Sequence, residues 1–119
     1  MKASFGSESF QPDNLVAANA HLLHSRQITI KSGQNLTRGA VLGKDGDGKY
    51  LLSLSAAVDG SEVPDLILAE DADATDGDVV TIAYSRGDFL ESALTIGTAH
   101  TAASIREGLR AKGIVLVSG

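Results

Sequence analysis

Short runs of alternating or continuously apolar residues predict β-strands along most of the chain. Residues 27–31 (QITIK) alternate at every position, which is typical of a strand with one buried face. Residues 79–84 (VVTIAY) give the strongest strand signal, and we expect the chain to turn at 85–87 into a further strand at 88–90. Two Asp-Gly pairs at 45–48 predict a hairpin turn, because Asp-Gly suits the backbone of tight hairpins. Additional strands are expected at 40–42, 50–54, 66–69 and 114–117.

One segment has helical periodicity instead. Ala102, Ile105 and Leu109 fall on one face of a helix whose other face is charged. Thr101 is a suitable N-cap, and Gly113 stands where a left-handed residue often follows a helix. Together with about seven or eight short strands, this helix predicts a fold that is mainly β with one helix (α+β). The expected architecture is a small barrel-like domain with an extended N-terminal arm.

The first 26 residues lack this alternation and form the predicted arm. They contain Phe5 and Phe10, two of the three Phe residues of the chain. Large aromatic side chains in a segment without a core of its own need a surface on which to be buried. We therefore divide the chain into an arm (1–26) and a β-rich core domain (27–119). Within the arm, residues 15–23 permit a short helix that would be too short to be stable alone.

Composition excludes several classes of function. The 119 residues carry 15 acidic and 10 basic side chains, and this net charge of −5 argues against nucleic acid, because phosphate binding needs clustered Lys and Arg. The absence of cysteine rules out disulfides, thiol catalysis and Cys-ligated metals. No apolar run reaches the roughly 18–20 residues of a membrane span, and the N-terminus lacks the apolar stretch of a signal peptide. We therefore expect neither a membrane partner nor export.

Two acidic clusters resemble calcium loops but lack ligands that the motif requires, and the first has Lys49 where the fifth position needs an oxygen ligand. A calcium loop of the EF-hand type closes with a Glu at its twelfth position. Counted from Asp45 that position is Ala56, and counted from Asp71 it is Ile82, so both loops lack the closing carboxylate. We expect a hairpin turn at the first cluster and a solvated loop at the second. The second cluster could instead meet basic groups of a partner; it contains Asp71, Asp73, Asp76 and Asp78.

No set of residues predicts a catalytic site. His21 and His24 would share one side of a helix, but two ligands without a third make a poor metal site. His100 precedes the predicted helix without any accompanying nucleophile motif. Residues 86–88 spell the adhesion tripeptide RGD, which we interpret as a tight turn between two strands. We expect no metal, no cofactor and no enzymatic activity.

The order of several segments resembles one known family. The opening of the core, residues 27–43 (QITIKSGQNLTRGAVLG), is similar to that of the lambda-type head decoration (capsid-stabilising) proteins of tailed phages and prophages. Phe10-Gln11-Pro12 is similar to the aromatic-Gln-Pro element in the arm of that family. The resemblance covers nearly the whole core and continues, in order, through residues 49–57, 67–71, 87–89, 100–110 and 113–114.

The resemblance implies a structural protein of the virion. Members form homotrimers that bind the exterior of the expanded capsid at three-fold and quasi-three-fold positions and stabilise it. Their small β-rich fold is called a β-tulip, and their N-terminal arm adds a strand to a sheet of the major capsid protein. By this resemblance, the capsid-binding arm of the present chain would use Phe5, Phe10, Gln11 and Pro12, without any cofactor. The protein would be made in the host cytoplasm and reside on the outer capsid surface.

A second class of function is compatible with a small β-rich domain. The alternative is a free-standing ligand-binding module, for example one that binds carbohydrate. Such modules usually offer exposed aromatic faces, and the chain has only two Tyr and no Trp. A small hydrolase is a third and weaker possibility. The capsid-binding structural protein is therefore the preferred hypothesis.

Overall fold

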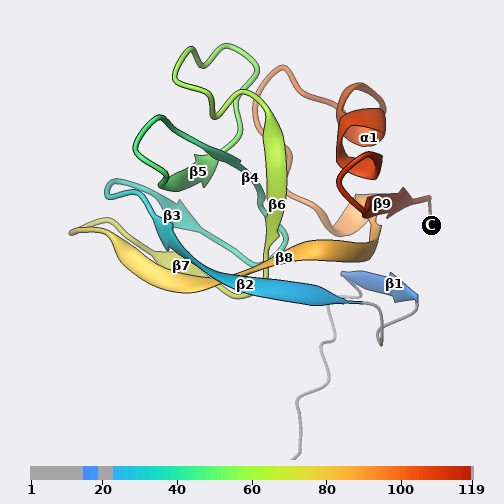
Figure 1. Cartoon of the computed structure of the whole chain (residues 1–119), viewed down its shortest axis with the longest axis horizontal. Coiled ribbons are helices and arrows are strands. Elements are labelled where there is room, and N and C mark those ends of the chain that lie inside the picture. Colours follow the sequence, from blue (N-terminus) through green and yellow to red (C-terminus); the bar gives the residue numbers. More distant parts are fainter. Residues whose placement is uncertain (1–14, 19–22, 119) are drawn as a thin grey trace, which may run out of the picture.

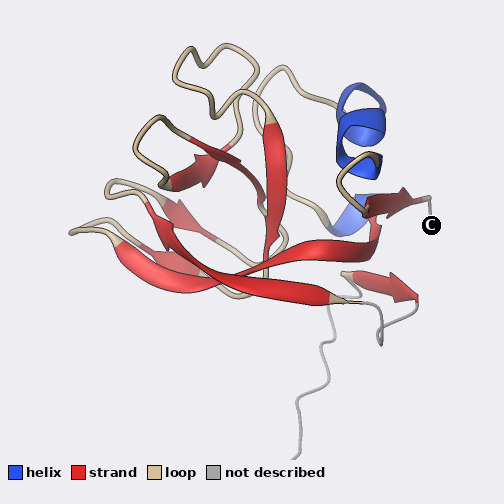
Figure 2. Ribbon diagram, viewed as in Figure 1, coloured by secondary structure: helices blue, strands red, loops and turns tan. Residues whose placement is uncertain are grey.

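The computed structural model describes residues 15–18 and 23–118, and these form a mainly β structure with one α-helix (Figure 2). None of the described helices is long and apolar enough to cross a membrane. In chain order the elements are β1 (Val16–Ala18), β2 (His24–Ile30), β3 (Asn35–Leu36), β4 (Val41–Lys44), β5 (Tyr50–Leu52), β6 (Pro64–Leu68), β7 (Ala72–Asp73), β8 (Val79–Leu90), the 3-10 helix η2 (Glu91–Ala93), α1 (Ala102–Arg110) and β9 (Ile114–Val117).

Five strands close into a barrel in the order β2–β5–β4–β6–β8, and β8 pairs back onto β2 (Figure 1). All of these pairings are antiparallel except the one between β2 and β5. The hairpin between β4 and β5 turns at the two Asp-Gly pairs, as the sequence predicts. Closure leaves the barrel strands without an open edge, since each of the five has a neighbour on both sides.

Alternation along these strands fills the barrel interior. Ile28 and Ile30 of β2 point inward and are 5% and 0% exposed, while the polar residues between and before them face outward or lie at the rim. The short β3–β7 pair packs against the same core through Leu36 and Ala72. The other members of this core are Ala40, Leu42, Tyr50, Leu66, Leu68, Ala74 and Ala83.

The predicted turn at 85–87 is wrong, because β8 continues unbroken from Val79 to Leu90. Up to Arg86 this strand pairs with β2, and from Gly87 onward it pairs with β9. Gly87 has a φ of +150°, a value that side-chain-bearing residues rarely adopt, and a Cβ there would lie 2.4 Å from Leu23 Cδ2. Glycine therefore allows β8 to change partners without a turn, so the RGD tripeptide lies within a strand.

Beyond the barrel, the second half of β8 forms a three-stranded ribbon with β1 and β9. Helix α1 packs on β9 and β6, and it covers a second core between the ribbon and the outer face of the barrel (Figure 1). The helix is confirmed as predicted: the Thr101 side chain accepts a hydrogen bond from Ser104 N at 3.0 Å, and Gly113 has a left-handed φ of +93°. The buried residues of this second core are Leu15, Val41, Ile67, Phe89, Ile105, Leu109, Ile114 and Leu116.

Three further expectations about local structure need correction. The possible helix at 15–23 is wrong where the structure describes it, because Val16–Ala18 form strand β1; residues 19–22 lie outside the described residues. A strand pairing that buries Leu15 outcompetes an isolated helix of this length. The strand expected at 50–54 ends at Leu52, and the acidic loop contains the short strand β7, which pairs with β3.

Candidate functional site

The base of the predicted arm is joined firmly to the core. Leu15 is only 1% exposed and lies in the second core with Phe89. Its carbonyl oxygen accepts a hydrogen bond from Leu90 N at 2.9 Å, and β1 then pairs antiparallel with β8. An apolar Leu followed by the β-branched Val16 suits a buried strand end. The chain ahead of Leu15 therefore starts from a fixed point beside the ribbon.

The two outer strands of the ribbon, β1 and β9, differ in whether a side chain contacts the backbone of the outer edge. On the β9 side, Arg106 of α1 donates from its guanidinium to Leu116 O at 2.7 Å and forms an ion pair with Glu91. This contact occupies an edge carbonyl that could otherwise pair with another strand. On the other side, β1 pairs only with β8 among the described strands. Among the described strands, the ribbon edge without such a contact is therefore that of β1, at the base of the arm.

The residues predicted to bind a capsid cannot be placed in this geometry. Phe5, Phe10, Gln11 and Pro12 lie outside the described residues. Sequence reasoning missed Leu15 as the anchor, since the apolar residues at 15–23 suggested a helix face. The signal that could have identified it is the Leu-Val pair, which is as typical of a short strand as of a helix.

The family comparison covers both the arm and the core. The family described as Bacteriophage lambda head decoration protein D matches residues 5–114 of the chain. The chain belongs to this head decoration family. A search of curated proteins finds no match. Membership of the family implies a structural protein that binds the phage capsid and is associated with the virion head.

The first acidic cluster of this head decoration protein is a structural turn. Asp45 Oδ1 accepts hydrogen bonds from the backbone N–H groups of Asp47 (2.9 Å) and Lys49 (3.0 Å), and Lys31 Nζ lies 3.3 Å from Asp45 Oδ2. Burial alone would raise the pKa of the Asp45 carboxyl, but the two backbone hydrogen bonds and the Lys31 ammonium group together lower it. The Asp45 carboxylate thus shapes the hairpin, in agreement with the predicted turn.

The second cluster in this decoration protein likewise holds loops in place. Asp71 accepts from Arg38 N (2.8 Å), and Asp73 accepts from Thr75 N (3.1 Å). Asp78 accepts from Ser32 N (2.9 Å) and pairs with Lys49 Nζ at 2.7 Å; this ion pair and hydrogen bond lower the pKa of its carboxyl. Within residues 15–18 and 23–118, no group of three or more His, Cys, Asp or Glu side chains is arranged to hold a metal.

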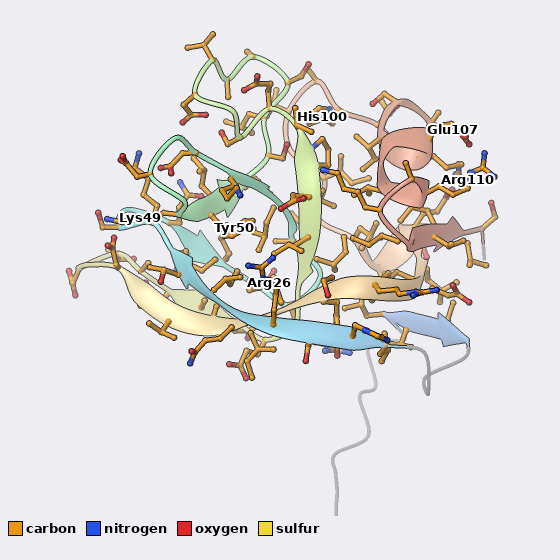
Figure 3. The ribbon with its side chains drawn as sticks, viewed as in Figure 1. Arg26, Lys49, Tyr50, His100, Glu107 and Arg110 are labelled. Atoms are coloured by element: carbon orange, nitrogen blue, oxygen red, sulfur yellow. The ribbon has the colours of Figure 1, made fainter. Side chains whose placement is uncertain are left out.

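The histidines and tyrosines offer no catalytic or sugar-binding geometry in the described part of the chain. His24 is exposed on β2, His21 lies outside the described residues, and His100 donates from Nε2 to Glu62 O at 3.0 Å (Figure 3). Its role is to join the loop before α1 to the loop before β6. Tyr50 is 3% exposed, and half-buried Tyr84 packs against Phe89 with ring centroids 5.4 Å apart, so neither presents an open aromatic platform.

Proposed function

We propose that the protein decorates the exterior of an expanded phage capsid as a homotrimer at three-fold and quasi-three-fold positions. In this role it stabilises the shell and catalyses no reaction. Residues 1–26 act as the capsid-binding arm, whose base is built into the fold through Leu15, β1 and the first residues of β2, and residues 27–119 form the decoration core. The family match carries the proposal, because it extends from residue 5 through the arm and most of the core. The buried anchor at Leu15 supports it, since an arm that fastens a shell needs a fixed origin.

The arm would bind the major capsid protein by adding a strand to one of its sheets. Phe5 and Phe10 can each contribute about 1.5–3 kcal/mol if their side chains become buried. Main-chain hydrogen bonds of the added strand contribute modestly in net terms. Pro12 suits the end of that strand, because it fixes φ and cannot donate to the ladder, and Gln11 beside it belongs to the same family element.

Three arms acting together would supply the affinity that a single arm lacks. Ordering a chain costs on the order of 1–2 kcal/mol of backbone entropy per residue, so the gain from one arm is nearly cancelled. When one arm of a rigid trimer has bound, the others bind at a high effective concentration. The proposal therefore joins trimer formation to capsid binding.

The test is to remove residues 2–14 and to measure binding to expanded, undecorated capsids by cosedimentation and imaging. We expect a folded core of unchanged oligomeric state that no longer decorates the shell. Phe5→Ala and Phe10→Ala should weaken binding to an intermediate degree. Ser9→Ala, a truncation between these positions that removes no aromatic ring, serves as the matched control and should bind like the unaltered protein.

Two results would contradict this mechanism. The arm would have no role if the shortened protein bound expanded shells as tightly as the full chain. The three-fold assignment would be wrong if the full chain stayed monomeric in the presence of capsids.

A further inference from the structure

A pocket of about 170 Å³ lies at one end of the barrel, beside the segment that follows α1. It is lined by Lys44 at the end of β4, by Asp65 of β6 and by Lys112 after the helix. Gly60 and Val63 of the loop before β6 complete the lining, and Val63 is 53% exposed. The lining thus combines an apolar side chain with two lysines.

The charges in this pocket do not cancel. The Asp65 carboxylate is matched within the fold: Lys112 Nζ lies 3.0 Å from Oδ1, and the Tyr50 hydroxyl donates to Oδ2 at 3.0 Å. Lys112 also donates to Pro64 O at 2.9 Å, so only one of its three N–H donors stays open. Exposed Lys44 forms no ion pair with any described residue. Its ammonium group gives the pocket an uncompensated positive charge.

Neighbouring groups keep this environment cationic. Burial would raise the pKa of the Asp65 carboxyl, but hydrogen bonds from Lys112 and Tyr50 and the charge of Lys44 lower it, so Asp65 is ionised and already paired. Burial and the hydrogen bond to Asp65 raise the pKa of Tyr50 to about 12, and the charge of Arg26 acts in the opposite direction (Figure 3). An incoming carboxylate would therefore meet Lys44 and the open donor of Lys112, with Arg26 nearby.

The same chain carries a surface that complements this pocket. The loop around β7 presents several carboxylates, of which Asp71 and Asp73 accept hydrogen bonds from backbone N–H and hydroxyl groups and form no ion pair with a described residue. Asp76 stands exposed at the tip, and it forms no ion pair with a described residue. An exposed carboxylate on a loop tip matches the size and charge of a small pocket with an unpaired lysine.

We infer that the Lys44–Lys112 pocket receives the Asp76 loop tip of a second copy of this chain. The inference rests on the self-association proposed above and identifies the surfaces that would form it. A ring of identical subunits needs two different, complementary patches on each copy. The pocket and the tip are not at opposite ends of the molecule, because Asp78 pairs with Lys49 in the hairpin that begins after Lys44. Two complementary patches that are not opposite each other allow successive contacts to turn toward a closed ring instead of extending in a line.

Reversing the charges one at a time and then together tests the contact in the full-length protein. Lys44→Glu and Asp76→Lys each place like charges against each other, and we expect the concentration of half-dissociation to rise at least about tenfold. The double variant exchanges the two charges and should return to within about threefold of the unaltered protein. Sedimentation over a dilution series measures all three, and recovery in the double variant shows that the single variants had not simply misfolded.

Matched controls lie on the far side of helix α1. Glu107→Lys and Arg110→Glu make the same charge changes at exposed positions that point away from the pocket (Figure 3), and they should leave the assembly unchanged. The inference fails if the unaltered protein associates and Lys44→Glu associates equally well, or if the double variant stays dissociated. It also fails if Lys44→Glu loses only capsid binding, since the pocket would then face the shell. An unaltered protein that stays monomeric even in the presence of capsids refutes the proposed trimer itself.

Discussion

At the scale of single residues, two glycines hold the long loop before β6 against the barrel. A Cβ at Gly43 would lie 2.0 Å from Ser61 O, and one at Gly97 would lie 1.9 Å from Ser53 O. Both serines are fully buried, so neither backbone segment can move away without opening the interior. These positions require glycine because of close approach, although neither has a positive φ.

Gly43→Ala should lower the free energy of unfolding by about 3 kcal/mol, because the added methyl group forces two backbone segments apart. Gly108→Ala is the matched control: Gly108 is exposed in the last turn of α1, and a Cβ there meets nothing within 4 Å. That control should stabilise the protein by about 0.5–1 kcal/mol, since alanine favours the helix. Urea unfolding of both variants measures the difference, and equal effects would show that the contact at Gly43 is not tight.

Single residues of this kind were the least predictable part of the molecule. Leu15 is one apolar residue among several in the first 26, and its burial depends on Phe89 and Leu109, which are distant in sequence. The need for glycine at 43 arises from a loop that packs against it from residue 61. Periodicity describes neighbours along one strand or helix, so it cannot reveal contacts between distant segments. The arm residues Phe5, Phe10, Gln11 and Pro12 stay a prediction.

At the scale of elements, the sequence was more informative. The helix, its Thr101 cap and the hairpin at the Asp-Gly pairs depend on local chemistry, and the structure confirms them. The turn predicted within β8 was wrong. A glycine between two strand-like segments often marks a turn, but Gly87 lies where β8 exchanges β2 for β9 as its partner. The fold class was predictable from short alternating segments, whereas the parallel pairing of β2 with β5 in the barrel depends on spatial arrangement alone.

Arg106 links two elements, and its removal should affect both. Its guanidinium donates to Leu116 O of β9 and pairs with Glu91 of η2. Arg106→Ala should cost about 1–2 kcal/mol of unfolding free energy and should promote aggregation by exposing the β9 edge.

Arg110→Ala removes the same side chain one turn later, where the ion pair with Glu107 is solvent-exposed, and should change stability by less than about 0.5 kcal/mol. Urea midpoints and light scattering test both variants. If the two variants had the same urea midpoint and scattered light equally, the Arg106 contact would not protect the edge of β9.

At the scale of the whole molecule, several turns depend on ionised carboxylates. The pKa values of five Asp side chains lie below their ordinary value of 3.8, and the causes include backbone, hydroxyl and lysine hydrogen bonds; they are Asp45, Asp59, Asp65, Asp73 and Asp78. A carboxyl with a lowered pKa in the folded state binds its proton at a lower pH than the same carboxyl in the unfolded chain. Its contribution to stability is therefore complete above pH 3.8 and is lost as the pH falls through the folded-state value.

We accordingly expect the free energy of unfolding to fall on acidification below about pH 4. Asp45→Asn should be less stable near neutrality, because it loses the ion pair with Lys31, and should show a shallower dependence on pH. Urea unfolding at several pH values measures this slope. An identical slope for Asp45→Asn and the unaltered protein would mean that the Asp45 charge has no part in folding.

The pairing of β1 with β8 also has a mechanical consequence. Hydrogen bonds between antiparallel strands run across the strand direction. Tension along β1 therefore loads the bonds between Leu15–Ala18 and β8 at the same time, in shear, instead of peeling them apart one after another. The Leu15 side chain must leave its buried position in the same step. A capsid-binding protein pulled through its N-terminal segment would thus behave like a lap joint, which holds until the whole overlap gives way.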